Sequence, residues 1–245
     1  FQLILVDNRD AGLSSKMTHL GVPNIGTLFW RQAFGLSIQS PYLLEDMAED
    51  YRLFLNHMGL SQCHVVGISM GSMIAQILAA EHPEYVSSVT LMHTGTGKRR
   101  HGLSTNPKAL QALAKRGKMD NADDYADYFA HLFSVVGSPN LQRSPDVLRE
   151  AGRALYERGH SPDGFKRQFA AILATGDRES YYTRIQQPCS VINGYADPLL
   201  PIAGAKAVER ATPQAMGYYF DDLGHDLPEK YSPIFAAIIK QTSER

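Results

Sequence analysis

Residues 65–76 read VVGISMGSMIAQ, and this stretch decides the fold. Two β-branched residues, typical of a buried strand, are followed closely by a serine with a glycine two positions away on either side. An apolar run with helical spacing then continues towards Pro83. The pattern Gly67-Ile68-Ser69-Met70-Gly71 therefore predicts a sharp turn that joins a strand to a helix and carries Ser69 at its tip.

A serine at such a turn is suited to nucleophilic chemistry. The turn holds its central residue in strained backbone geometry, and we expect the glycines at positions 67 and 71 to remove Cβ atoms that would collide there. The hydroxyl of Ser69 would then lie above the sheet at the positive end of a helix dipole, with the backbone N–H of Met70 placed to bind an anion. The alternative is that Ser69 is an ordinary helix cap.

The segments around this turn indicate an α/β fold. Strands are expected at residues 2–6, 63–67, 87–92, 190–193 and 216–220, and the first three are mostly apolar throughout, as in strands covered on both faces. Helical spacing over 44–58, with Gly59 as the C-terminal cap, and over 73–83 places helices between them. This alternation predicts a doubly wound, mostly parallel sheet.

A long interval without a predicted strand follows residue 92. A structureless connection of that length would be unusual, so the interval must carry structure of its own. Apolar residues at helical spacing over 125–136 and 165–173, and the N-cap pairs Ser144-Pro145 and Ser161-Pro162, predict helices. We therefore expect residues 98–185 to form a helical cap over the C-terminal edge of the sheet, and residues 1–97 and 186–245 to form the core.

The composition is that of one globular domain with an insertion. Lys and Arg number 24 against 25 Asp and Glu in 245 residues, a balance that favours neither nucleic acid nor a membrane surface as partner. The run KRR at 98–100 is expected to be a solvated loop. Cys63 and Cys189 suit buried thiols in a reducing compartment, which makes the cytoplasm the expected location. The chain opens inside the apolar run FQLILVD, so we expect a cut start.

A serine nucleophile needs a general base within hydrogen-bond reach. His225 stands in DDLGHDLPEK, between the last predicted strand and the final helix, where a loop residue reaches the same edge of the sheet as Ser69. The alternative is a loop histidine that packs on Leu227. Other histidines are expected at a strand start, at helix ends or in the cap: His64, His57, His82, His101, His131 and His160.

The base in turn needs an acid to orient it. Asp197, in VINGYADPLLP, follows a predicted strand, and Pro198 stiffens the turn behind it. The chain order Ser69, Asp197, His225 is the order expected for an α/β-hydrolase. An Asx-type turn formed by Asp197 alone is the alternative. Asp221 and Asp222 are rivals by proximity, but we expect them to be solvated or capping.

These motifs together resemble those of the α/β-hydrolase superfamily, in its branch of capped, esterase-like hydrolases. The resemblance runs through VDNRDAGLS, PYLLEDMAED, HVVGISMGSMIAQILAAEHPE, PCSVINGYADPLLP and GHDLPE, and so covers the chain outside the cap. It implies that Asp7, Arg9, Asp10 and Gly12 shape a loop rather than take part in catalysis. It also implies about three strands before residues 2–6, the third ending in a loop that completes the oxyanion hole; we expect these to be missing here, with a gap in the sheet.

We therefore expect a serine hydrolase that cleaves a small-molecule carboxylic ester with Ser69, His225 and Asp197, without a metal or organic cofactor. Serine at the nucleophile position argues against haloalkane dehalogenase and epoxide hydrolase chemistry, which the resemblance associates with aspartate there. Perhydrolysis, and cleavage of a lactone, an amide or a carbon–carbon bond, are alternatives with the same triad. A non-catalytic ligand binder, or an inert truncated scaffold, is the alternative of another class. The aromatic residues of the cap either line a pocket or belong to its core.

Overall fold

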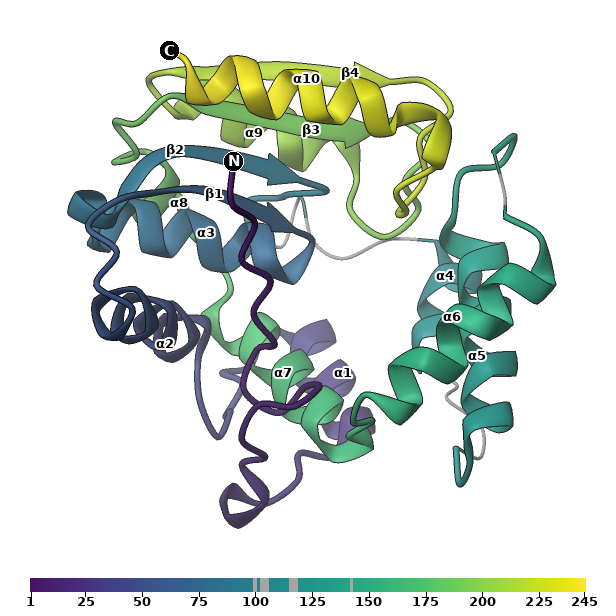
Figure 1. Ribbon diagram of the computed structural model, residues 1–245. Helices are drawn as coiled ribbons and strands as arrows, with labels where there is room; N and C mark the ends of the chain where they lie inside the picture. The colour runs from purple at the N-terminus through teal and green to yellow at the C-terminus, as the bar shows by residue number, and fades with distance from the viewer. Residues whose placement is uncertain (99–100, 102–105, 115–118, 142) are drawn as a thin grey trace.

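The computed structural model describes residues 1–98, 101, 106–114, 119–141 and 143–245. At its centre lies a four-stranded sheet in the order β1-β2-β3-β4, in which all neighbouring strands are parallel (Figure 1). The strands are β1 (Cys63–Ile68), β2 (Val86–Met92), β3 (Cys189–Gly194) and β4 (Ala215–Phe220). Four of the five expected strands therefore form, and the doubly wound parallel architecture is confirmed.

Helices connect the strands and extend the fold on one side. Their bounds are α1 (Ile25–Phe34), α2 (Leu44–His57), α3 (Met70–Glu81), α4 (Pro107–Ala114), α5 (Ala122–Val136), α6 (Pro145–Glu157), α7 (Pro162–Thr175), α8 (Glu179–Tyr182), α9 (Ile202–Ala211) and α10 (Ser232–Ser243). The expected cap of the second helix is present, since Gly59 has a φ of 66° and directly follows the C-cap residue Met58.

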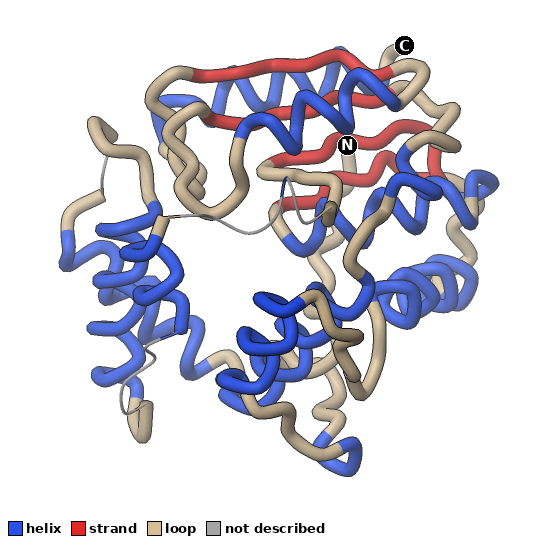
Figure 2. Tube along the Cα trace, turned by 180° about the vertical axis from the view of Figure 1, so that it is seen from behind, coloured by secondary structure: helices blue, strands red, loops and turns tan. Residues whose placement is uncertain are grey.

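The sheet is covered on both faces because its central strands alternate between two apolar clusters. Val89 and Val191 pack with α2, α3 and α9, whereas Met92 and Ile192 pack with Phe235 of α10. Figure 2 shows the red strands enclosed between these blue helices. Parallel sheets are usually covered on both faces in this way, and β2 and β3 are accordingly buried along almost their whole length.

Residues 2–6 do not form the expected strand. The segment runs in an irregular, exposed course in front of the sheet, with Phe1, Leu3 and Leu5 largely open to solvent (Figure 1). A strand needs a neighbour that pairs with its backbone, and β1 pairs only with β2. The expectation was wrong because apolar, β-prone residues do not form a strand without a neighbouring strand to pair with.

Strand β1 lies at the edge of the sheet, and one of its faces is uncovered. Val65 is half-buried and packs against the central apolar cluster, and Gly67 is buried. The alternating residues Val66 and Ile68 are more than 40% exposed, since α10 contacts β2 and β3 rather than β1.

The expected helices of residues 98–185 form in two groups. Helices α4, α5 and α6 pack on one another, apart from the sheet, while α7 packs against α1 and α2 (Figure 1). The hydroxyl oxygens of Ser144 and Ser161 accept hydrogen bonds from Val147 N and Gly164 N, so both expected N-caps are confirmed. Of the run at 98–100, Lys98 pairs with Glu179, and residues 99 and 100 lie outside the described residues.

The N-terminal loop is fixed to the helices by ion pairs. The buried Asp10 carboxylate accepts two hydrogen bonds from Arg167 of α7 and one from the Tyr42 hydroxyl. Arg9 makes a two-pronged pair with Asp50 of α2. These contacts agree with an architectural role for the loop.

Both cysteines are free thiols. Burial raises the pKa of Cys63 and raises that of Cys189 to about 12, so both remain protonated at neutral pH. Within the described residues, no helix combines the length and the apolar character needed to cross a bilayer.

Candidate active site

The turn between β1 and α3 is strained at its tip. Ser69 has φ 54° and ψ −118°, a conformation that few residues other than glycine adopt. A Cβ atom on Gly67 would lie 2.3 Å from the carbonyl oxygen of Gly71, which explains the first glycine. A Cβ atom on Gly71 would meet nothing within 4 Å, so the expected collision at this second glycine is absent.

The side chain of Ser69 does not cap α3. Its carbonyl oxygen, rather than its hydroxyl, accepts the hydrogen bonds from Ser72 N and Met73 N that begin the helix. The hydroxyl oxygen instead lies 3.0 Å from Nε2 of His225. The first N–H of α3, that of Met70, has no acceptor within the helix and lies next to this hydroxyl in the chain.

Parallel pairing places the residues after three strands at one edge of the sheet. Ile68, Met92 and Ile192 are partners in the register, so the residues that follow them emerge side by side. Ser69 follows β1 directly and His93 follows β2 directly, while Asp197 lies in the turn after β3. His225 lies in the loop after β4, and the topology therefore brings together residues from distant parts of the chain.

Asp197 joins the imidazole of His225 to the end of the sheet. Its Oδ2 atom lies 2.8 Å from Nδ1 of His225, and its Oδ1 atom accepts hydrogen bonds from Leu199 N at 2.8 Å and Leu200 N at 3.0 Å. The Asx-type turn considered above and the contact with His225 thus coexist, each on a different carboxylate oxygen. Asp222, a rival acid, instead accepts the hydroxyl of Tyr231.

The electrostatics at Asp197 favour a carboxylate. Burial by itself raises the pKa of Asp197, but the charge of His225, the hydrogen bond from His225 and that from His93 together lower this pKa well below its usual range. Asp197 is therefore ionised throughout the neutral pH range and can orient and stabilise a charged imidazole.

A second histidine contacts the same carboxylate, and the sequence reasoning missed it. Nδ1 of the buried His93 lies 3.1 Å from Asp197 Oδ2, and its Nε2 lies 3.0 Å from the carbonyl oxygen of Asp226. The sequence does contain a signal for His93, because this residue directly follows a predicted interior strand. Asp197 was selected as a candidate for the same reason.

The loop that carries His225 is bound to the C-terminal end of α5. His225 N donates to the carbonyl oxygen of Val136 at 2.7 Å, and Gly224 N donates to the hydroxyl oxygen of Ser138 at 2.9 Å. Ser138 donates to Asp226 Oδ1 through both its N–H and its hydroxyl. Residues 136–138 and the histidine loop therefore hold one another, and we call these contacts the 136–138 clasp.

A cavity of about 380 Å³ opens above Ser69 and His225. Its wall is mostly apolar and includes Phe129 and Phe133 of α5, so these two aromatic residues line a pocket. Tyr125 instead packs, with tilted ring planes, against the rings of Tyr128, Phe129, Tyr156 and His160. Arg143, which also lines the cavity, places a cation there.

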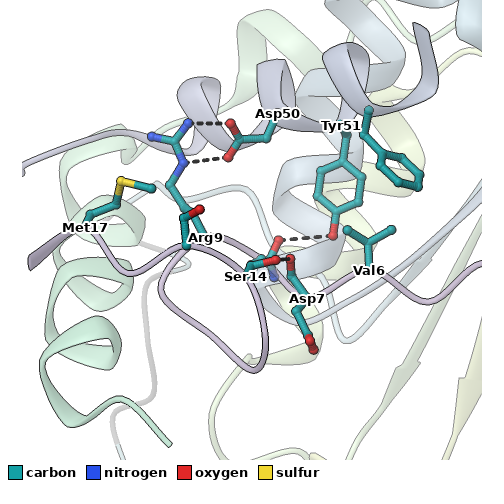
Figure 3. A pocket seen from close by; sticks show the side chains of 10 residues that line it. Val6, Asp7, Arg9, Ser14, Met17, Asp50 and Tyr51 are labelled. Carbon is teal, nitrogen blue, oxygen red and sulfur yellow. Dashed lines mark hydrogen bonds and ion pairs between the residues drawn. The ribbon is translucent and has the colours of Figure 1, made fainter. Parts of the chain in front are cut away.

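A smaller cavity of about 240 Å³ lies between the N-terminal loop and α2 (Figure 3). The charge of Arg9 is neutralised there by Asp50, and the hydroxyl of Tyr51 donates to Asn8. The hydroxyl of Ser14 donates to the carbonyl oxygen of Asp7. These polar groups are engaged in holding the loop, so the cavity above Ser69 is the candidate active site.

His93, Asp197 and His225 also have the residue types of a metal site, with ligand atoms within 4.8 Å of one another. A tetrahedral zinc ion, with ligands at about 2.0–2.1 Å, would separate its ligand atoms by about 3.3 Å. The separations to Asp197 Oδ2 are 2.8 and 3.1 Å, which fit direct hydrogen bonds better. We therefore interpret the cluster as a hydrogen-bonded network.

Comparisons with known proteins agree with this architecture. The curated relatives include the rhodomycin D methylesterase DnrP of Streptomyces peucetius, 24% identical over 98% of this chain and 80% of the relative. A pimeloyl-[acyl-carrier protein] methyl ester esterase of Chromobacterium violaceum is 27% identical over 66% of this chain, which spans only 62% of that esterase.

Among solved structures, the α/β hydrolase MGS-M2 from a Medee basin deep-sea metagenome library superposes with a TM-score of 0.66, at 17% identity, over 98% of this chain and 78% of its own. This likeness shows the fold. Both curated relatives carry esterase names. Residues 1–230 match the α/β hydrolase fold family, and the chain therefore belongs to that family.

Proposed function

We propose that this protein is a serine hydrolase that cleaves carboxylic esters of small molecules. The observation that carries the proposal is the continuous chain of contacts from Ser69 Oγ through His225 to Asp197, at 3.0 and 2.8 Å. These distances lie within the reach required of a nucleophile, its base and the acid that orients the base.

In this mechanism Nε2 of His225 accepts the proton of Ser69 as the hydroxyl oxygen attacks the ester carbonyl. Asp197 keeps the Nδ1 proton of His225 in place and stabilises the imidazolium that forms. The negative charge on the carbonyl oxygen is met by the N–H of Met70 at the start of α3. The imidazolium then returns its proton to the leaving alcohol, and a water molecule activated by His225 hydrolyses the acyl-enzyme.

The cavity supports a substrate with a largely apolar body. Phe129 and Phe133 supply apolar surface above the serine, and a volume of about 380 Å³ is in the range of small-molecule sites. The same attack also opens a lactone, and 3-oxoadipate enol-lactonase 2 of Acinetobacter baylyi is among the relatives, at 27% identity over 66% of this chain. Lactones therefore belong beside linear esters in a substrate panel.

The proposal is tested by labelling with a fluorophosphonate and by turnover of p-nitrophenyl esters of increasing acyl length. Labelling and turnover are expected in the wild-type protein, and Ser69→Ala should abolish labelling and lower kcat by at least about 10⁴-fold. Ser243→Ala, at the end of α10, is the matched control and should retain both. A folded wild-type protein that neither reacts with the probe nor turns over any ester or lactone would contradict the proposal and favour a non-catalytic ligand binder or an inert scaffold.

A further inference from the structure

The carboxylate of Asp197 has no acceptor position left for water. Oδ1 accepts the N–H groups of Leu199 and Leu200, and Oδ2 lies within hydrogen-bond distance of both His225 and His93. A carboxylate offers about four acceptor sites, and here all four face protein donors. The side chain of Asp197 is also fully buried, so its position is determined by these partners alone.

The contacts of His93 imply its proton count. Its Nδ1 faces the carboxylate of Asp197, and its Nε2 faces the carbonyl oxygen of Asp226. Both partners are acceptors, whereas a neutral imidazole carries only one N–H. A neutral His93 would therefore direct a lone pair at an oxygen about 3 Å away, within an almost fully buried side chain. With a proton on each ring nitrogen, both contacts become hydrogen bonds.

We propose that His93 is a positioning residue: a buried imidazolium that fixes the carboxylate of Asp197 and opposes protonation of His225. The second effect rests on the proposed function, because it concerns His225 as the general base. The ring centroids of His93 and His225 are 5.0 Å apart, so a charge on one acts directly on the other.

The surroundings of His93 are consistent with a single cation. Asp197 is the carboxylate that faces its ring, since the carboxylate of Asp226 is turned to Ser138 and only the backbone of Asp226 reaches His93. His225 and Arg143 are the other charged or titratable groups that line the same cavity with it. A charged His93 and the carboxylate of Asp197 neutralise one another. The cluster of His93, Asp197 and His225 therefore gains a net positive charge only when His225 accepts a proton.

The backbone of His93 adds an independent indication. Its φ is 47°, and Ser69, His93 and Asp10 are the residues other than glycine with positive φ among those the structure describes. Such conformations are uncommon outside glycine and are retained where surrounding contacts determine them. The ring of His93 lies between the two loops that carry Asp197 and His225, since it contacts Asp197 in one and the backbone of Asp226 in the other.

The first test compares two substitutions that separate the charge of His93 from its hydrogen bond to Asp197. His93→Asn keeps a donor for Asp197 but removes the charge, so the acidic limb of the kcat/KM profile should move to higher pH by about one unit. His93→Phe removes both the donor and the charge, so kcat should fall by about tenfold or more while KM changes little. His64→Asn, in an exposed histidine of β1 that contacts Ser88, is the control and should leave the profile in place. An unshifted limb in His93→Asn, or an unchanged kcat in His93→Phe, would overturn the proposal.

The second test needs no variant to fold. In ¹⁵N-labelled wild-type protein at pH 7, long-range ¹H–¹⁵N spectra assigned through the His93 backbone should show a proton on both ring nitrogens. A single N–H on His93 would overturn the proposal. This readout does not depend on turnover: if Ser69 reacts with no probe and no ester is cleaved, the proposed function fails while the spectrum still decides the state of His93.

Discussion

The backbone N–H of His225 donates to the carbonyl oxygen of Val136 over 2.7 Å. The proposed base is thereby attached to the last residue of α5, the helix whose Phe129 and Phe133 line the cavity above it. The position of the imidazole and the shape of the cavity thus depend on the same helix.

The 136–138 clasp predicts that Ser138 affects turnover although it does not line the cavity. Ser138→Ala removes the hydroxyl that donates to Asp226 and accepts from Gly224, on both sides of His225. We expect kcat to fall by about tenfold because a buried donor and acceptor lose their partner. Ser134→Ala, whose hydroxyl donates to His131 on the exposed side of α5, is the control. Equal kcat values for the two variants would contradict the prediction.

The two glycines of the turn should respond differently to alanine. Gly67→Ala places a Cβ atom 2.3 Å from the backbone of Gly71, and the turn must shift to admit it. We expect a loss of about 1–3 kcal/mol in the free energy of unfolding, typical of overpacking, together with loss of fluorophosphonate labelling. Gly71→Ala meets no atom within 4 Å and should fold with nearly wild-type stability. Urea unfolding of both variants decides between this outcome and equal destabilisation.

The lowered pKa of Asp197 predicts a pH-dependent contribution to stability. Because folding depresses this pKa, the contribution is fully present above the ordinary carboxyl pKa of about 3.9 and is lost as the pH falls below it. The difference in unfolding free energy between wild type and Asp197→Asn should therefore shrink between about pH 5 and pH 3. Asp146→Asn, in an exposed carboxylate of α6, should show no comparable trend. A wild-type advantage over Asp197→Asn that is constant across this range would argue against the depressed pKa.

The cation in the cavity predicts a preference among esters. Arg143 lines the mostly apolar cavity and donates one hydrogen bond to the carbonyl oxygen of Leu227. Its guanidinium has further donors, so a carboxylate at the far end of an acyl chain gains a charge-assisted contact. Arg143→Gln should lower kcat/KM about tenfold for a dicarboxylic acid monoester.

The matched substrate is a neutral ester of the same length, which Arg143→Gln should cleave as the wild type does. Arg149→Gln, which alters an exposed arginine paired with Asp127, is the control variant for both substrates. An equal loss on both esters would show that Arg143 acts on the cavity wall rather than on substrate charge.

Local patterns in the sequence predict most of the sheet and the meeting of three site residues. The order of strands places Ser69, Asp197 and His225 at one edge because parallel strands end there together, and the contacts of 3.0 and 2.8 Å follow from that topology. Residues 2–6 were misjudged because strand formation depends on a partner edge, which composition does not reveal. His93 was overlooked because its partner is defined only when the loops after β3 and β4 have folded over it. The 136–138 clasp depends on side-chain and backbone contacts between segments far apart in the chain, for which no short-range pattern exists.

The positive φ angles of Ser69 and His93 have a consequence for engineering this protein. Glycine would relax the backbone at Ser69, a half-buried residue, so a screen for thermostability alone would favour Ser69→Gly and would discard the proposed nucleophile. His93→Gly would also relax the backbone, but it would empty a buried site and leave the carboxylate of Asp197 without a partner, so it should lower the melting temperature. Heat resistance and turnover are therefore expected to compete at Ser69 and to agree at His93, and a library designed to raise the melting temperature should hold Ser69 constant.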